Sequence, residues 1–214
     1  MRVDFHTHTS RSADALTSPR ALVARAAAAG LDRIAVTDHG RIDGALAAAD
    51  VDPDRVIVGE EVHCREGVHL IGLYVSAHVP HDLSVRDAAG RIRDQGGVVY
   101  APHPFAYPWD PARKADLVLG VAELVEVFNA RAFFPPWNRQ AAAAAAARGL
   151  PAAASSDAHF PWEIGRAWTE LPPFAGAAEL RAVVAQARPV PRVLTTPVVH
   201  GLSLGLELLR TLGR

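Results

Sequence analysis

Short apolar runs rich in β-branched residues alternate along the chain with longer stretches of helical periodicity. This alternation is typical of repeated strand–helix units around a parallel sheet. We expect strands at Arg2–His8, Arg33–Thr37, Val56–Val62, His69–Val75, Gly97–Ala101, Leu124–Phe128, Pro151–Ser155 and Arg166–Leu171. We expect helices at Pro19–Ala29, Ile42–Ala49, Val85–Gln95, Asn138–Arg148, Ala177–Ala187 and Leu202–Leu212. Ser18 before Pro19 is a typical helix start, and Gly30 and Gly149 fall where helices should end.

The alternation is interrupted once, because only a short turn at Arg65–Gly67 separates the third and fourth strands. These two strands are therefore predicted to form an antiparallel hairpin. Glu61 and His69 are symmetric about Arg65, so we expect them to be cross-strand neighbours on one face. Glu60 would then point to the other face, and a slip of one residue would exchange the two glutamates.

No internal repeat or linker is visible, and residues 1–214 are expected to form a single α/β domain. The formal net charge of −1 gives no electrostatic reason to expect duplex nucleic acid as a partner. It is compatible with a nucleotide or an oligonucleotide end. Cys64 is the lone cysteine, which excludes an internal disulfide and a metal site built from thiolates alone.

The sequence also carries an expectation about membranes and location. No stretch approaches the roughly 18 uncharged apolar residues of a membrane span. The first residues lack the positively charged start and apolar run of a signal peptide. We therefore expect a cytoplasmic protein without a membrane partner, whereas its oligomeric state stays open.

Histidines and carboxylates gather at the ends of the expected strands. In the pair formed by His6 and His8, both imidazoles point to one face, because residues two apart in a strand do so. Asp38 could support a metal-binding imidazole from behind. The candidate ligands are His6, His8, Asp14, His39, Glu61, His69, His103, Asp157 and His159. The other four histidines lack this context and are given no ligand role: His63, His78, His81 and His200.

These motifs resemble the PHP family, named for its polymerase-associated and histidinol-phosphatase members. The matching segments occur in the family's order and span about three quarters of the chain: His6-Thr7-His8, Thr37-Asp38-His39-Gly40, Gly59-Glu60-Glu61, His69, Pro102-His103-Pro104 and Ser156-Asp157-Ala158-His159. The resemblance implies a distorted TIM-like barrel of seven βα units with two or three divalent ions at one end.

The resemblance also implies how the ligands are shared among the ions. One ion would be held by His6, His8, Glu61 and Asp157. Glu61 would bridge to a second ion, which is also held by His69 and His103. A third would be held by Asp14, His39 and His159. Asp14 is followed by Ala15 where many members have an Asp-Gly pair, and an apparent insertion sets it one residue later.

A metal-dependent hydrolase acting on phosphate esters is the function that this pattern favours. Imidazole and carboxylate ligands without thiolate suit Zn²⁺, Mn²⁺ or Fe²⁺. Closely spaced ions can activate water and neutralise phosphoryl oxygens, with Glu61 and Asp157 at the catalytic centre. Arg166 and Arg131 are candidates for binding the phosphate of a small phosphorylated metabolite or a nucleotide, and ordinary surface arginines are the alternative.

Three other functions stay open from the sequence. The same centre could hydrolyse a C–N bond, which an apolar pocket without phosphate-binding arginines would favour. A nuclease that trims single-stranded ends is a second possibility, although no basic stripe supports it. A non-catalytic metal-binding module is the third, and the presence of all nine candidate ligands argues against it. The C-terminal helix, with Leu202, Leu206 and Leu209 at helical spacing, is expected to pack on the barrel rather than on a second subunit.

Overall fold

The computed structural model describes residues 1–107, 109–195 and 197–212, without the side chains of Pro197, His200 and Thr211, and its strands form one sheet. The strands are β1 (Arg2–Asp4), β2 (Arg33–Val36), β3 (Val56–Cys64), β4 (Val68–Leu73), β5 (Val98–Ala101), β6 (Leu124–Asn129), β7 (Ala152–Ser155), β8 (Ala167–Glu170) and β9 (Arg188–Pro191). Their order is β7-β6-β5-β4-β3-β2-β1-β8-β9. β1, β2 and β3 are parallel, as are β5, β6 and β7, whereas β4 runs antiparallel to both of its neighbours.

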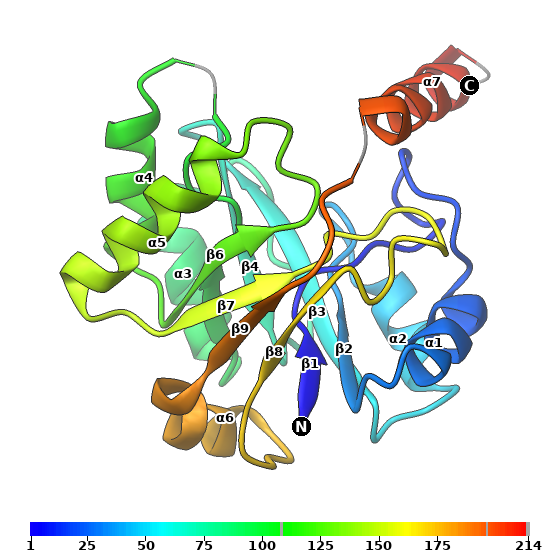
Figure 1. Ribbon diagram of the computed structural model, residues 1–214, viewed down its shortest axis with the longest axis horizontal. Helices are drawn as coiled ribbons and strands as arrows, with labels where there is room; N and C mark the ends of the chain where they lie inside the picture. Colours follow the sequence, from blue (N-terminus) through cyan, green and yellow to red (C-terminus); the bar gives the residue numbers. More distant parts are fainter. Residues whose placement is uncertain (108, 196, 213–214) are drawn as a thin grey trace.

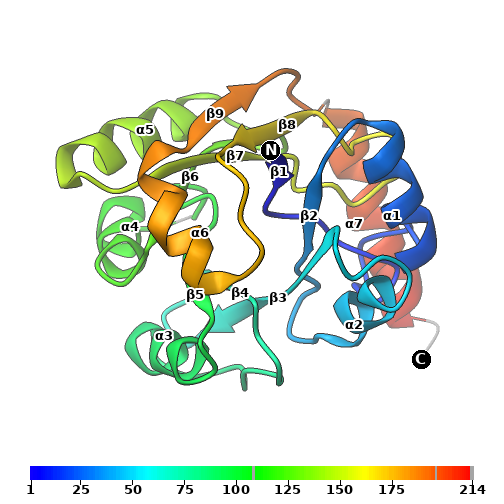
Figure 2. The same ribbon diagram turned by 90° about the horizontal axis from the view of Figure 1, so that it is seen from below.

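The sheet curls into a nearly closed barrel (Figures 1 and 2). At the seam between β7 and β8, the hydroxyl of Thr169 donates to the carbonyl of Ala154 at 3.0 Å and accepts from its N–H at 2.9 Å. A side chain thus joins two strands that share no backbone ladder. The expected α/β class and distorted TIM-like barrel are confirmed.

Helices surround this barrel and close its amino end. They are α1 (Pro19–Ala28), α2 (Asp43–Ala49), α3 (Val85–Asp94), α4 (Pro111–Leu119), α5 (Pro136–Arg148), α6 (Ala177–Val183) and α7 (Pro197–Leu212). The interior is filled by Phe5, Ile57 and Tyr100 together with Leu180 of α6. Helix α6 lies under the barrel in Figure 1. Because side chains block that end, the open end lies at the carboxyl side of the parallel strands.

Local signals explain where the helices begin and end. The hydroxyl of Ser18 accepts the N–H of Ala21 at 3.3 Å, and Gly149 ends α5 with a φ of 63°. Two elements were not expected. Helix α4 is short and begins at a proline, with Asp110 as its cap, and β9 contains two prolines that sequence patterns assign to loops.

The first strand is shorter than expected, because Arg2–His8 keeps a regular ladder only as far as Asp4. The following residues stay held between neighbours through single backbone bonds. The N–H of His8 donates to Ala158 at 2.9 Å, and the carbonyl of Thr7 accepts from Thr37 at 2.8 Å. The pair of histidines is therefore anchored outside a regular strand.

Helix α7 lies against its own barrel, but two of the three leucines expected to pack there face solvent. Leu202 and Leu209 are 50% and 73% exposed, so the apolar contact predicted for them is wrong, whereas Leu206 is half-buried. Besides the buried Val199, polar contacts attach the helix, with the hydroxyl of Ser203 accepting from Arg131 and the guanidinium of Arg210 donating to loop carbonyls. No helix within the described ranges is long and apolar enough to cross a membrane.

Candidate metal centre

All nine predicted ligands lie together at the carboxyl end of the barrel strands. Glu61 is at the centre of the cluster and is almost fully buried. Its Oε2 lies 3.3 Å from Nε2 of His6 and 3.0 Å from Nδ1 of His39. Its Oε1 lies 2.9 Å from Nδ1 of His69 and 3.2 Å from Nε2 of His103. Oε2 also lies 3.4 Å from Nε2 of His8, so one carboxylate contacts five imidazoles, which suits a bridge between cations.

Four ligand atoms of the cluster lie at separations typical of neighbouring ligands on one metal ion. Nε2 of His6 lies 3.0 Å from Nε2 of His8, and these nitrogens lie 3.4 and 3.2 Å from Oδ1 of Asp157. They lie 3.3 and 3.4 Å from Oε2 of Glu61. Ligands bound at about 2.0–2.1 Å in a tetrahedron are separated by about 3.3–3.4 Å. The arrangement therefore fits a Zn²⁺-sized ion.

A second group of ligands lies on the other side of His8. Oδ2 of Asp14 lies 2.8 Å from Nε2 of His159 and 3.5 Å from Nε2 of His39. The rings of His39 and His159 each have centroids 4.3 Å from that of His8. The structure thus brings Asp14 to the cluster in spite of the apparent insertion before it.

Unsatisfied atoms in the cluster fit bound cations. Oδ1 of Asp14, Oδ1 of Asp157 and Nδ1 of His69 are buried, and none of them forms a hydrogen bond of normal geometry, although other ligand atoms lie close to the last two. Buried polar atoms are normally paired, and a lone pair that faces other lone pairs is satisfied by a cation. The donor set and its spacing are thus those of a metal centre.

The hairpin brings Glu61 and His69 onto one face, although the predicted register is wrong. The strands pair Glu61 with Ile71 and His63 with His69, so the turn is centred on Glu66 rather than Arg65. The error shifts the pairing by two residues, and an even shift keeps each side chain on its face. Glu60 points to the other face, where it contacts His78 at 2.6 Å.

Glu126 supports the cluster from behind and was missed from the sequence. Its Oε1 lies 3.2 Å from Nδ1 of His6, which leaves Nε2 of that ring facing the other ligands. Its Oε2 accepts the backbone N–H of His103 at 2.7 Å and the amide of Asn129 at 2.9 Å. Carboxylates in this position fix the tautomer of metal-binding histidines. In the sequence, a charged residue inside the apolar strand β6 was the signal that could have indicated this role.

Asp38 supports the cluster less directly than predicted. Its carboxylate accepts from the backbone and hydroxyl of Thr9, at 2.7 and 2.6 Å, and from the hydroxyl of Ser12 at 2.7 Å. The same hydroxyl of Ser12 accepts the N–H of His39 at 3.2 Å. Asp38 therefore holds the loops that carry the ligands rather than an imidazole.

Two ligands have a left-handed backbone. His103 has a φ of 26° between its two prolines, and Asp157 has a φ of 52°. Such conformations cost about 1–3 kcal/mol for residues other than glycine and occur at functional sites. The amide of Asn129 holds the second oxygen of Asp157 at 3.0 Å, so Oδ1 is turned toward the histidines.

Without a cation, the cluster holds protons on some of its imidazoles. Burial lowers the pKa of His6, but the carboxylates led by Asp157 outweigh burial and raise that pKa well above its ordinary value. Burial is likewise outweighed at His39 and His103, where contact with Glu61 raises each pKa. A cation that binds here has to displace these protons.

In other members of the cluster the pKa is lowered rather than raised. Burial and the nearby imidazoles of His159 and His39 lower the pKa of His8 to about 3. Burial opposes ionisation of Glu61, yet the imidazoles around it, led by His69, hold its pKa well below the usual range. Neutral imidazoles and ionised carboxylates are the forms that bind metal.

The two predicted phosphate-binding arginines contact the protein itself. Nη1 of Arg131 is 2.9 Å from both carboxylate oxygens of the buried Glu163. Nη1 of Arg166 donates to the hydroxyl of Thr195 at 2.9 Å. Arg131 also lines a cavity of about 300 Å³ with His69 and other residues. Their contact with substrate stays a prediction.

Arg11 and Arg41 are two further arginines at the cluster. They line a cavity of about 380 Å³ together with Asp14, His39, His63 and His69. Both guanidinium groups contact the one carboxylate of Asp43, at 3.3 and 2.6 Å. Both arginines are thus paired with Asp43, and Glu207 of α7 lines the same cavity. Their positions three and two residues after predicted ligands were the signal in the sequence.

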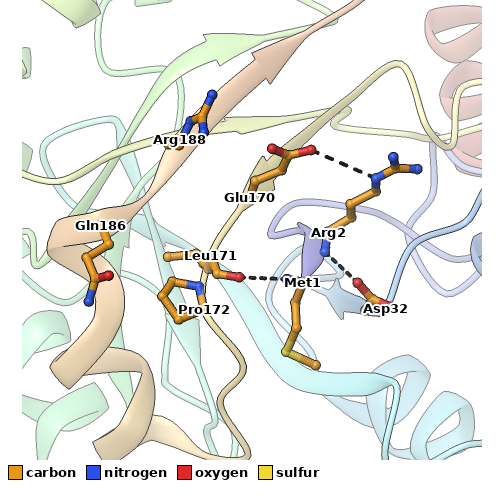
Figure 3. A pocket seen from close by; sticks show the side chains of 8 residues that line it. All are labelled: Met1, Arg2, Asp32, Glu170, Leu171, Pro172, Gln186 and Arg188. Carbon is orange, nitrogen blue, oxygen red and sulfur yellow. Dashed lines mark hydrogen bonds and ion pairs between the residues drawn. The ribbon is translucent and has the colours of Figure 1, made fainter.

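Other polar groups lie away from this centre. A cavity of about 480 Å³ at the amino end of the barrel is lined by Met1, Arg2, Asp32, Glu170, Leu171, Pro172, Gln186 and Arg188 (Figure 3). Within it, the ammonium of Met1 donates to the carbonyl of Leu171 at 2.6 Å, and the N–H of Arg2 donates to Asp32 at 2.7 Å. No predicted ligand lines this cavity. The side chain of His200 lies outside the described residues.

Comparison with known proteins agrees with the site. The family model of the PHP domain matches residues 4–69, and that of the PHP-associated region matches residues 135–189. A protein of Methanocaldococcus jannaschii, the uncharacterized MJ1587, is 32% identical over 146 residues, which cover 61% of this chain and 82% of that protein. The chain belongs to the PHP family. A second uncharacterized protein of that organism, MJ0417, is 32% identical over 181 residues, which cover 80% of this chain and 70% of that one.

Solved structures share the barrel of this PHP protein. A two-domain protein of Bacteroides vulgatus, which contains a predicted PHP-like metal-dependent phosphoesterase, has a TM-score of 0.71 at 18% identity. The match covers 96% of this chain and 69% of that one. An amidohydrolase of Chromobacterium violaceum with bound sulfate has a TM-score of 0.67 at 21% identity, over 86% of this chain and 97% of that one.

The expectation that duplex nucleic acid is not a partner is wrong for this fold. Endonuclease Q, in complex with a 27-mer duplex that carries an abasic lesion at the active site, has a TM-score of 0.64 at 15% identity. The match covers 86% of this chain and 56% of that one. Net charge averages over the whole surface, whereas a phosphodiester is met by a few local groups. The charge of this chain therefore could not exclude a duplex.

Proposed function

We propose that this PHP protein is a metal-dependent phosphoesterase whose active site is the cluster around Glu61. The observation that carries the proposal is the close spacing of four ligand atoms, since the Nε2 atoms of His6 and His8 lie 3.0 Å from each other and 3.2–3.4 Å from the carboxylates of Glu61 and Asp157. Two or three divalent ions, of Zn²⁺, Mn²⁺ or Fe²⁺, would supply Lewis acidity and neutralise the phosphate there. Phosphate monoesters and nucleotide phosphodiesters are the proposed substrates.

The residues of this chain would bind and orient the ester. Arg11 and Arg41 face the cavity beside Asp14 and His39, where an anion would meet their guanidinium groups. The cavity on the other side, with Phe133 at its rim, would accept the organic part of the substrate. Phe133 is 67% exposed, so it is open to contact. Arginines at the centre favour a phosphate ester over a C–N substrate.

We also propose that residues 1–214 act as one domain. β1 at the start of the chain pairs with β2 on one side and with β8 on the other. The ammonium of Met1 and the carbonyl of Leu171 are joined at 2.6 Å. The start of the chain is thus held in the same sheet as a strand near residue 170.

The test is metal analysis of the purified protein together with turnover of p-nitrophenyl phosphate, bis-p-nitrophenyl phosphate and p-nitroacetanilide. We expect hydrolysis of a phosphate ester that is lost on chelation and restored by Mn²⁺ or Zn²⁺. Asp157→Asn should lose this activity, whereas Asp116→Asn, on the outer helix α4, should keep it. Hydrolysis of the anilide alone would overturn the proposed reaction in favour of C–N cleavage. Absence of bound metal would overturn the proposed centre.

A further inference from the structure

The loop that carries Asp14 is fastened by the last helix of the chain. Nη1 of Arg210 in α7 donates to the carbonyl of Ser12 at 2.8 Å, to that of Ala15 at 3.1 Å and to that of Ala13 at 3.2 Å. These carbonyls flank Asp14 on both sides. One guanidinium group, separated from this loop by almost the whole chain, thus binds its backbone at three points.

Few other bonds define the middle of this loop. The hydroxyl of Ser12 is held by Asp38 at 2.7 Å, and the N–H of Leu16 donates to His159 at 2.9 Å, so both ends are fixed. Between them, three carbonyl dipoles converge and repel one another unless a cation lies among them. Arg210 supplies this positive charge, and with it the loop can keep Asp14 turned toward the histidines.

The first half of α7 is connected to His159, which is predicted to hold the same ion as Asp14. The hydroxyl of Ser203 accepts from Nη2 of Arg131 at 2.9 Å, and Nη1 of Arg131 is paired with Glu163. Oε2 of Glu163 accepts the backbone N–H of His159 at 3.0 Å. Helix α7 therefore contacts the support of both Asp14 and His159.

We propose that Arg210 is a positioning residue for the ion held by Asp14, His39 and His159, and that α7 thereby completes this one position of the centre. The inference rests on the proposed metal centre. Arg210 acts on the backbone around Asp14 and contacts none of the ligands of the other ions. Its influence should therefore be confined to a single ion.

The sign of the effect separates positioning from simple electrostatics. Removing a positive charge beside a cation site lowers the repulsion, so Coulomb's law alone predicts tighter binding in Arg210→Ala. Loss of positioning predicts weaker binding, since residues that orient ligands typically contribute about 10–100-fold to metal affinity. The two explanations thus give opposite results in one measurement.

The experiment is equilibrium dialysis of the metal-free full-length protein against a range of Mn²⁺ concentrations, with bound metal measured by atomic emission. The variants are Arg210→Ala and the double variant Arg210→Ala with Ser203→Ala, which removes both anchors of α7. The matched control is Arg148→Ala, an arginine of the outer helix α5 that, like Arg210, donates to a backbone carbonyl and that also pairs with the carboxylate of Asp116. Circular dichroism establishes that each variant is folded.

We expect the weakest Mn²⁺ site of Arg210→Ala to lose about 10–100-fold in affinity, while the remaining sites and Arg148→Ala stay within about twofold of the native protein. Unchanged or tighter binding at every site would overturn the inference and leave the proposed centre intact. An equal loss at all sites would also overturn it, because it indicates general loosening. A native protein that binds no Mn²⁺ and no Zn²⁺ would instead remove the proposed centre itself.

Discussion

Replacing Glu126 with glutamine should change which nitrogen carries the proton of the neutral His6 ring, the form that binds metal. Two backbone or amide N–H groups, from His103 and Asn129, donate to Oε2 of Glu126, at 2.7 and 2.9 Å. These donors are fixed, so the single carbonyl oxygen of glutamine has to stay with them. Its NH₂ group then faces Nδ1 of His6, which has to accept a hydrogen bond. The proton of the ring is therefore moved to Nε2, the atom that faces Glu61 and Asp157.

A protonated Nε2 cannot bind a cation. To bind one, the ring has to return to the other tautomer and place two N–H groups against each other. Loss of such a supporting carboxylate typically lowers metal affinity by about 10–100-fold, which corresponds to about 1.4–2.7 kcal/mol. Glutamine has nearly the volume of glutamate, so no cavity forms. We therefore expect a defect in metal binding with a small change in the stability of the metal-free fold.

The assay is competition for Zn²⁺ between the metal-free protein and a chromophoric chelator at fixed pH. The control is Glu123→Gln, the same chemical change at a partly exposed carboxylate that pairs with Arg181 on the outside of the barrel. We expect Glu126→Gln to bind its tightest Zn²⁺ about 10–100-fold more weakly and Glu123→Gln to bind as the native protein does. Equal Zn²⁺ affinity in both variants and the native protein would refute the tautomer argument.

Three further predictions concern the ligands and the loops around them. Glu61→Gln should lower kcat/KM for a phosphate ester by at least about 10³-fold and remove more than one ion, because Glu61 contacts the predicted ligands of two different ions. Turnover and metal analysis measure these effects, and loss of a single ion would contradict the bridging role. In chemical denaturation, the free energy of unfolding of the metal-free protein should fall as the pH rises above 6.5. Imidazoles whose pKa is raised on folding stabilise the fold below their unfolded pKa of about 6.5, and this stabilisation is lost as the pH passes the folded pKa. Metal-loaded protein should not show this fall, and a flat profile of the metal-free protein would argue against the raised pKa values. Gly44→Ala should destabilise the fold by about 1–3 kcal/mol, since the added Cβ would lie 2.0 Å from Oδ2 of Asp38. The control Gly90→Ala has open space in a helix and should be neutral or stabilising by up to about 1 kcal/mol, and equal melting temperatures of the two variants would count against the clash.

The clustering of the candidate ligands could be predicted because it depends on local rules. Residues two apart on an extended segment share a face, and the carboxyl ends of parallel strands meet at one end of a barrel. These rules brought His6 and His8 together with ligands from other strands. The hairpin register was wrong by two residues, yet Glu61 and His69 still share a face because face depends only on whether the shift is even.

Contacts between distant segments could not be predicted in the same way. Arg131 resembles a phosphate-binding arginine in sequence, but its partner Glu163 lies 32 residues away and is fully buried. The leucines of α7 have the spacing of a packed helix, yet Arg210 and Ser203 attach this helix by polar bonds. Periodicity indicates which side chains share a face and does not indicate which face meets the protein.

The β3–β4 hairpin limits how the length of this chain can change during evolution. Its turn has three residues and is closed by Gly67, which has a φ of 68° and donates its N–H to Cys64 at 2.9 Å. Adding or deleting one residue within either strand would turn His69 away from Glu61, whereas a change of two would keep it inward. Ile71 of β4 also pairs with Tyr100 of β5, which fixes the register of β4 on its other side. A single inserted residue therefore has to be accommodated in the turn or as a bulge, without shifting the rest of the strand. Relatives that keep both ligands should therefore differ here by even numbers of strand residues, or by loops that grow only beyond Cys64 and Val68.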